Sequence, residues 1–196
     1  MEIELYSPRN QLLKKYIECF YTLKRSPTDE TISYLGFPSV KIFVVICNNA
    51  EIILERENIT VANSHNRLPE SLLIFDFEKS GSIRYTGETS EISIYFKPLG
   101  LNAFLDRKLN EYKTAAVSHF NPFEDYKTRM AEIFAIENDD AMIEALENYW
   151  LSKLKGFEHR FLEKVVAEIM DENNSQMTIS DIAKKNKISR TTLNKH

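Results

Sequence analysis

Two helix starts that follow one another within residues 177–193 constrain the fold of this chain more than any other feature. Thr178 and Asp181 have the spacing of a capping box, in which each side chain accepts a hydrogen bond from the other residue's backbone amide. A second start of the same kind follows at Ser189. Two short helices joined by a few residues are typical of a helix-turn-helix, whose second helix enters the major groove of DNA.

Charge is divided unevenly along the chain. Residues 177–196 carry five lysines and arginines against Asp181 alone, which gives this segment a net charge of +4 within a protein of net charge −4. The first 176 residues therefore sum to −8. An acidic domain joined to a basic end favours a nucleic-acid reader attached to a separate unit. A solvated lysine-rich tail is the alternative interpretation.

The first hundred residues indicate β-structure. Runs rich in β-branched and aromatic residues alternate with turn signals. The expected strands are Tyr16–Leu23, Thr31–Leu35, Val40–Cys47, Glu51–Leu54, Ser71–Phe77 and Glu91–Phe96. The third of these is nearly continuous in apolar residues, which predicts burial on both faces. Many short strands with regular turns favour a small barrel or a sandwich.

Helices are expected from Pro98 onward, so the fold class is α+β. Asn121-Pro122 is a predicted helix start, and a second helix is expected from about Asn138 to a glycine stop at Gly156. A third helix is expected to begin at Phe157. We therefore predict two domains: residues 1–156, β-rich with helices at about 98–156, and residues 157–196, a partial all-α helix-turn-helix domain.

Several function classes have little support. The four histidines are scattered, no Gly-rich phosphate loop is present, and no Cys/His spacing suits zinc, so we expect neither an enzyme nor a metal or other cofactor. Cys19 and Cys47 lie in strand-like surroundings and are interpreted as buried reduced thiols, the alternative being a disulfide between them. No apolar run approaches the length of a membrane helix, and no signal peptide is evident.

The C-terminal segment resembles the first half of the DNA-binding domain of AraC/XylS transcription regulators. The matching residues are Met177-Thr-Ile-Ser-Asp-Ile-Ala183 followed by Lys-Lys-Asn-Lys-Ile-Ser-Arg-Thr-Thr-Leu193. In that family, a small residue at the position of Ala183 lets the helices cross closely. Residues 6–21 and 94–101 also resemble the sensor domains of these regulators. The resemblance implies a cupin-like sensor or dimerisation domain, a cytoplasmic location and a homodimer.

Two departures from the family accompany this resemblance. An apolar residue usually stands where this chain has Asn186, and glycine often stands near the turn where it has Lys187. A left-handed lysine costs on the order of 1 kcal/mol relative to glycine, so the turn could instead shift to Asn186. Family members also carry a second helix-turn-helix, which this sequence lacks. We expect a fragment of a longer protein, the alternative being a natural short form with impaired DNA binding.

The residues expected to contact double-stranded DNA fall into two groups. We expect the second helix to contact base edges and nearby phosphates, because arginine pairs with guanine, asparagine pairs with adenine and threonine contacts thymine methyl groups. Lysines around the turn are assigned to phosphates. The full set is Lys184, Lys185, Lys187, Ser189, Arg190, Thr191, Thr192, Asn194 and Lys195. With a single motif, binding is expected to be weak.

The sequence does not decide whether the β-domain senses a ligand or forms a dimer. Its aromatic residues are sufficient for a small-molecule pocket, although aromatic residues on strands more often form core. They are Tyr21, Tyr34, Phe37, Phe43, Phe75, Phe77, Tyr85 and Tyr95. The sequence identifies no ligand-binding residue. The alternative function is a dimerisation or interaction module, derived from such a regulator, that does not bind DNA.

Overall fold

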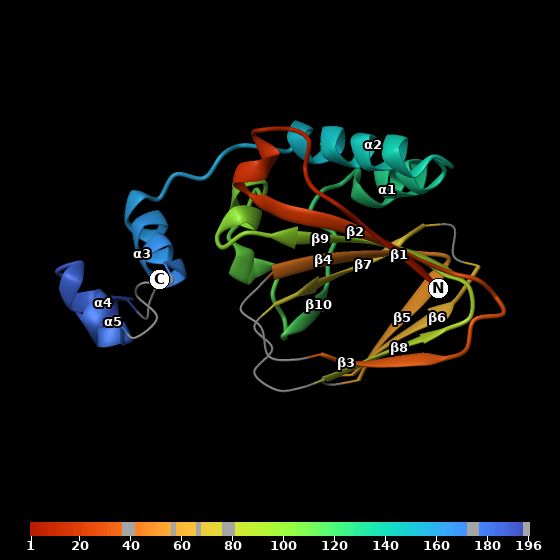
Figure 1. The fold of residues 1–196 in the computed structure, drawn as a ribbon, viewed down its shortest axis with the longest axis horizontal. Helices are drawn as coiled ribbons and strands as arrows, with labels where there is room; N and C mark the ends of the chain where they lie inside the picture. Colours follow the sequence, from red (N-terminus) through yellow and green to blue (C-terminus); the bar gives the residue numbers. More distant parts are fainter. Residues whose placement is uncertain (37–41, 56–57, 66–67, 76–80, 172–176, 194–196) are drawn as a thin grey trace. The chain divides into compact units, whose positions relative to one another are not determined.

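Strands fill the first half of the chain and helices follow them, which makes the fold α+β (Figure 1). The computed structural model describes residues 1–36, 42–55, 58–65, 68–75, 81–171 and 177–193. The structure divides into two compact units, residues 1–156 and 157–196. All strands among the described residues belong to the first unit.

The larger sheet has six strands in the order β1-β2-β9-β4-β7-β10. Their bounds are β1 Glu2–Tyr6, β2 Ile17–Arg25, β4 Ile42–Asn48, β7 Glu70–Ile74, β9 Thr89–Phe96 and β10 Val117–His119. Every neighbouring pair is antiparallel. Val44 to Cys47 on β4 are all buried, as the apolar run predicted.

The smaller sheet has four strands in the order β3-β8-β6-β5. Their bounds are β3 Ile32–Gly36, β5 Ala50–Glu55, β6 Asn58–Asn63 and β8 Gly81–Thr86. β6 and β8 run parallel, and the other pairs are antiparallel. Each sheet keeps its own edge strands in the described part of the chain, so of the two expected architectures the described residues form two open sheets and not a closed barrel.

The two sheets enclose an apolar core. Leu23, Val45, Ile52, Ile59 and Leu72 are among its buried members. Successive side chains of a strand point to opposite faces, so β9 contributes to two layers of the structure. Its odd-numbered residues from 91 to 95 face this core, whereas residues 92, 94 and 96 face the helices.

Helices cover the other face of the six-stranded sheet (Figure 1). They are α1 Tyr126–Phe134 and α2 Asp139–Ser152, preceded by short 3₁₀ helices η1 Leu13–Lys15, η2 Gly100–Ala103 and η3 Leu109–Glu111. Asn138 caps α2 by accepting a 2.9 Å hydrogen bond from the amide of Ala141, which confirms the predicted start of this helix. The predicted start at Asn121-Pro122 is wrong, because α1 begins after Asp125.

An aromatic cluster fastens these helices to the sheet. The Trp150 ring lies 5.4 Å from that of Phe96 and 5.2 Å from that of Phe104, in edge-to-face geometry. Tyr126 packs against the same tryptophan at 6.4 Å. Trp150, Phe104 and Tyr126 are fully buried, so burial of large apolar area holds α1 and α2 in place.

The segment η2 is wedged against the chain before β2. A Cβ built on Gly100 would lie 2.1 Å from the carbonyl oxygen of Tyr16, so only glycine fits there. At the other end of η2, the Ala103 carbonyl accepts hydrogen bonds from the amides of Lys155 and Gly156 at 2.9 and 3.1 Å. The last residues of the first unit are thereby fixed to η2.

The second unit contains α3 Arg160–Met170, α4 Ile179–Lys185 and α5 Arg190–Leu193. Val165 of α3 and Ile182 and Ala183 of α4 are buried. Within the described residues of both units, every helix is too short or too polar to cross a membrane.

Candidate nucleic-acid interface

The first helix of the interface, α4, begins at the predicted capping box. Asp181 accepts a 2.9 Å hydrogen bond from the Thr178 amide, and Thr178 Oγ1 accepts one of 3.3 Å from the Asp181 amide. Two of the amides that a helix start leaves without intrahelical partners are therefore satisfied. The Thr178 hydroxyl donates a further 2.6 Å hydrogen bond to the Asp181 carboxylate, and this bond, together with that from the Thr178 amide, holds the pKa of the Asp181 carboxyl below its usual range. Ile182 and Ala183 face inward, which leaves the other side of α4 to solvent.

The turn after α4 has the geometry of a Schellman motif. The Lys187 amide donates to the Lys184 carbonyl, and the Ile188 amide donates to the Ala183 carbonyl, both at 3.0 Å. Such a turn requires a left-handed residue directly after the helix cap. Lys187 takes that position with φ of 56°, whereas Asn186 keeps a φ of −88°. The turn therefore does not shift to the asparagine.

The basic side chains expected to bind DNA are exposed on both sides of this turn. Lys184 and Lys185 occupy the last turn of α4, and Lys187 lies in the turn itself. Ser189, Arg190 and Thr191 are also exposed, at and after the start of α5. Asn194, Lys195 and the side chain of Thr192 lie outside the described residues.

One acidic residue approaches this basic group. The Glu168 carboxylate on α3 lies 3.7 Å from Lys185 Nζ and accepts a 2.7 Å hydrogen bond from the Asn186 side-chain amide. Sequence reasoning assigned no role to Glu168 or to the Asn186 side chain. The two residues are 18 positions apart, so no local spacing indicates that they meet.

A second candidate site lies between the two sheets of the first unit, around Glu91 of β9. Its carboxylate is buried and accepts hydrogen bonds from the Tyr85 hydroxyl at 2.5 Å and the Ser93 hydroxyl at 2.8 Å. Cys47 Sγ lies 3.9 Å away. Within the described residues, Glu91 has no ion pair with lysine or arginine. Burial raises the pKa of Glu91, and these hydrogen bonds oppose that rise.

Aromatic rings continue from this carboxylate along the inner face of the six-stranded sheet. The Tyr95 ring lies 4.1 Å from that of Phe43 and 5.7 Å from that of Tyr21. Burial beside Glu91 also raises the pKa values of Tyr21 and Tyr85 above the usual range, so both hydroxyls remain hydrogen-bond donors. Of the remaining aromatic residues expected here, Phe37, Phe77 and the side chain of Tyr34 lie outside the described residues.

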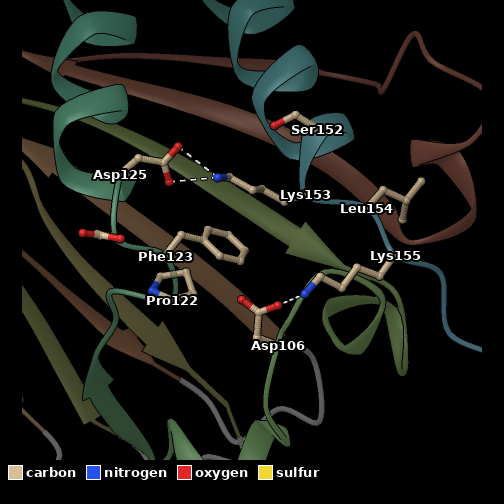
Figure 2. A pocket seen from close by; sticks show the side chains of 9 residues that line it. Asp106, Pro122, Phe123, Asp125, Ser152, Lys153, Leu154 and Lys155 are labelled. Atoms are coloured by element: carbon tan, nitrogen blue, oxygen red, sulfur yellow. Dashed lines mark hydrogen bonds and ion pairs between the residues drawn. The ribbon is translucent and has the colours of Figure 1, made fainter.

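An open pocket of about 650 Å³ lies where α1 begins and α2 ends (Figure 2). Lys153 forms a 2.9 Å ion pair with Asp125, and Lys155 is paired with Asp106. The Lys153 hydrogen bond lowers the pKa of the Asp125 carboxyl. Because the lysines at this pocket are paired with carboxylates, they offer an ionic ligand little net charge.

No described group of three or more His, Cys, Asp or Glu side chains is arranged to hold a metal ion. The exposed basic surface around the turn can approach a polyanion such as DNA. Comparison with known proteins adds no identity: no family model, curated protein or solved structure matches this chain.

Proposed function

We propose that this chain is a sequence-specific DNA-binding transcription regulator similar to the AraC/XylS family, acting in the cytoplasm. The observation that carries the proposal is the exposed basic surface at the α4–α5 turn, where Lys184, Lys185, Lys187 and Arg190 are all exposed. The helices beneath this surface are packed through Ile182 and Ala183. A basic surface on a packed helix pair can approach DNA without unfolding.

In this proposal, α4 and α5 form a helix-turn-helix with α5 in the major groove. Arg190 pairs with guanine, Asn194 pairs with adenine, and Thr191 and Thr192 contact thymine methyl groups or phosphate. Ser189 lies at the start of this reading helix. The lysines, Lys195 included, neutralise phosphates and give the affinity a steep dependence on salt. A single reading helix provides weak binding, so the functional species is a homodimer.

The first unit would act as a cupin-like sensor, with a small-molecule effector bound between its sheets. Glu91, Ser93 and Tyr85 supply hydrogen-bonding groups there, and Tyr95 and Phe43 supply aromatic surface. Sites for small molecules are typically cavities lined by apolar side chains with a few polar groups among them. The effector would act on DNA binding through the first unit, with no cofactor or catalytic step.

A dimerisation module without DNA binding is the second candidate function. β1 is an edge strand of the six-stranded sheet, and its Ile3 and Leu5 side chains are 55% and 73% exposed. An exposed apolar edge strand favours pairing with another chain. In this alternative, the protein forms mixed dimers with a partner and leaves the basic surface unused.

Fluorescence anisotropy with a short labelled duplex of mixed sequence separates these two functions. We expect binding by the full chain to weaken by at least about tenfold between about 50 and 200 mM salt. Arg190→Ala should weaken it further, whereas Lys14→Ala, which removes an exposed lysine from η1 of the first unit, should not. Absence of binding at low salt, together with a dimer in sedimentation, would favour the second function.

A further inference from the structure

The α4–α5 turn is fastened to α3 through one asparagine side chain. The Asn186 amide donates a 2.7 Å hydrogen bond to Glu168 and a 3.0 Å hydrogen bond to the Ile182 carbonyl. The first contact reaches α3, and the second goes to a carbonyl of α4 that also accepts a 3.0 Å hydrogen bond from the Asn186 backbone amide. A single side chain therefore joins the end of one helix to the side of another.

Glu168 is placed to make this contact strong. Its side chain is 13% exposed, so its carboxylate is largely shielded from water. A hydrogen bond to an ionised acceptor is about twice as strong as one between neutral groups. Lys185 at 3.7 Å and Lys164 at 4.0 Å offset the cost of holding this charge close to the surface. Glu168 thus faces positive or hydrogen-bonding groups on both α3 and α4.

The contact between Asn186 and Glu168 influences the direction of the chain because Lys187 follows Asn186 directly. Lys187 is left-handed, a conformation that a lysine adopts only when its surroundings hold it there. The Ile188 amide, which bonds back to the Ala183 carbonyl, depends on the same conformation. Fixing Asn186 against α3 stabilises the turn directly before the strained residue.

We propose that Glu168 and Asn186 form a positioning pair that sets the direction in which α5 leaves the turn and presents its first residues to DNA. This inference rests on the proposed DNA-binding function. The pair touches no base, and it acts through the turn on Ser189, Arg190 and Thr191. Glu168 also holds Lys185 close to α3, which couples the direction of α5 to the placement of one phosphate-binding lysine.

The test combines amide hydrogen exchange without DNA and anisotropy with the mixed-sequence duplex, both on the full chain. Asn186→Ala and Glu168→Ala should each speed exchange of the Ile188 amide by at least about tenfold and weaken duplex binding by a similar factor. The double variant should be no worse than either single variant, because both changes remove the same contact.

Glu168→Gln separates positioning from charge. Glutamine keeps an oxygen that can accept from Asn186, so Ile188 exchange should stay within about twofold of the original chain and duplex binding should be kept or strengthened. Glu144→Gln removes the same charge from an exposed position on α2 and should change neither readout. Arg190→Ala should weaken binding without altering exchange, as expected for a residue that contacts DNA directly.

Two failures are distinguishable. If the original chain does not bind the duplex, the proposed function fails, and the exchange data alone decide whether the pair orders the turn. If the chain binds but Asn186→Ala leaves both the exchange and the affinity unchanged, the positioning pair is overturned and the DNA-binding function stands.

Discussion

The Tyr85 hydroxyl in the four-stranded sheet donates a 2.5 Å hydrogen bond to the Glu91 carboxylate in the six-stranded sheet. This contact is polar and lies beside a core built mainly from apolar side chains. Both groups are buried, so neither can exchange its partner for water without opening the sandwich. Loss of this hydrogen bond should therefore destabilise the first unit, and two predictions concern it.

Tyr85→Phe should lower the free energy of unfolding by about 1–3 kcal/mol, because it leaves the buried carboxylate without its closest donor. Urea unfolding followed by tryptophan fluorescence measures this change, since Trp150 lies in the same unit. Tyr112→Phe is the matched control. The Tyr112 hydroxyl is buried without a partner among the described residues, so its removal should cost almost nothing. Equal losses in the two variants would contradict this interpretation.

Glu91→Gln should change how stability depends on pH. Burial raises the folded-state pKa of Glu91, so the unfolded chain loses this proton first as pH rises. Stability should therefore fall from about pH 4.3, the ordinary pKa of glutamate, up to the raised folded-state value. The glutamine variant should not show this fall. A difference curve between the two proteins that is flat above pH 4.3 would show that Glu91 titrates normally.

The same pH series contains a separate effect of opposite sign. The pKa values of the Asp125 and Asp181 carboxyls are lowered in the folded chain by their hydrogen bonds. Their contribution is present above the ordinary aspartate pKa of about 3.9 and is lost as pH falls through the folded-state values. Both proteins retain these groups, so the difference curve removes their effect.

Gly100→Ala should lower the free energy of unfolding by about 2–3 kcal/mol, because the added methyl group would collide with the Tyr16 backbone. This loss lies at the upper end of the usual range for overpacked sites. Thermal unfolding by circular dichroism measures the loss. Gly156→Ala is a useful comparison, since a Cβ there meets nothing within 4 Å although φ is 82°. It should cost only the left-handed strain of about 1–2 kcal/mol. A larger loss at Gly156 than at Gly100 would contradict the close approach.

Lys187→Gly should raise the stability of residues 157–196 by about 1 kcal/mol, because glycine adopts the left-handed conformation without strain. Lys184→Gly, three positions earlier within α4, should lower it by about the same amount, because glycine is a poor helix former. Amide exchange in α4 measures both changes. The two variants remove the same charge, so opposite signs would exclude a charge effect as the cause.

Local signals predicted the helix starts that they control directly. Thr178 with Asp181, and Asn138, act over three residues, and the structure confirms both caps. Asn121-Pro122 carries an equally clear signal, but α1 starts later. The intervening Phe123 ring lies 6.1 Å from Trp150, so packing on the aromatic cluster holds this stretch outside the helix.

The sequence patterns did not predict β1, β6, β8 or β10, and β8 shows how distant pairing can hide a strand. β6 contains two asparagines and β8 contains glycine and serine, which favour turns when they are considered in isolation. β6 pairs with its neighbour β5, but β8 pairs only with strands that are distant in sequence, β6 in parallel and β3 antiparallel, within the described residues. A contact between strands so far apart in sequence leaves no periodic pattern within either one.

The polar contacts in both candidate sites were unpredictable for the same reason. The alternation of β9 indicated a strand, but it could not show that Glu91 would lie beneath Tyr85 of the other sheet. Asn186 was recognised only as a departure from a family pattern. Its meeting with Glu168 depends on how α3 packs against α4.

The two hydrogen bonds accepted by the Ala103 carbonyl have a mechanical consequence. They attach the backbone at Lys155 and Gly156 to the end of η2. Gly100, at the start of η2, is packed closely against the backbone of Tyr16. A movement of η2 would therefore also move the backbone at Lys155 and Gly156. The backbone that leaves the first unit therefore starts from a position fixed on η2.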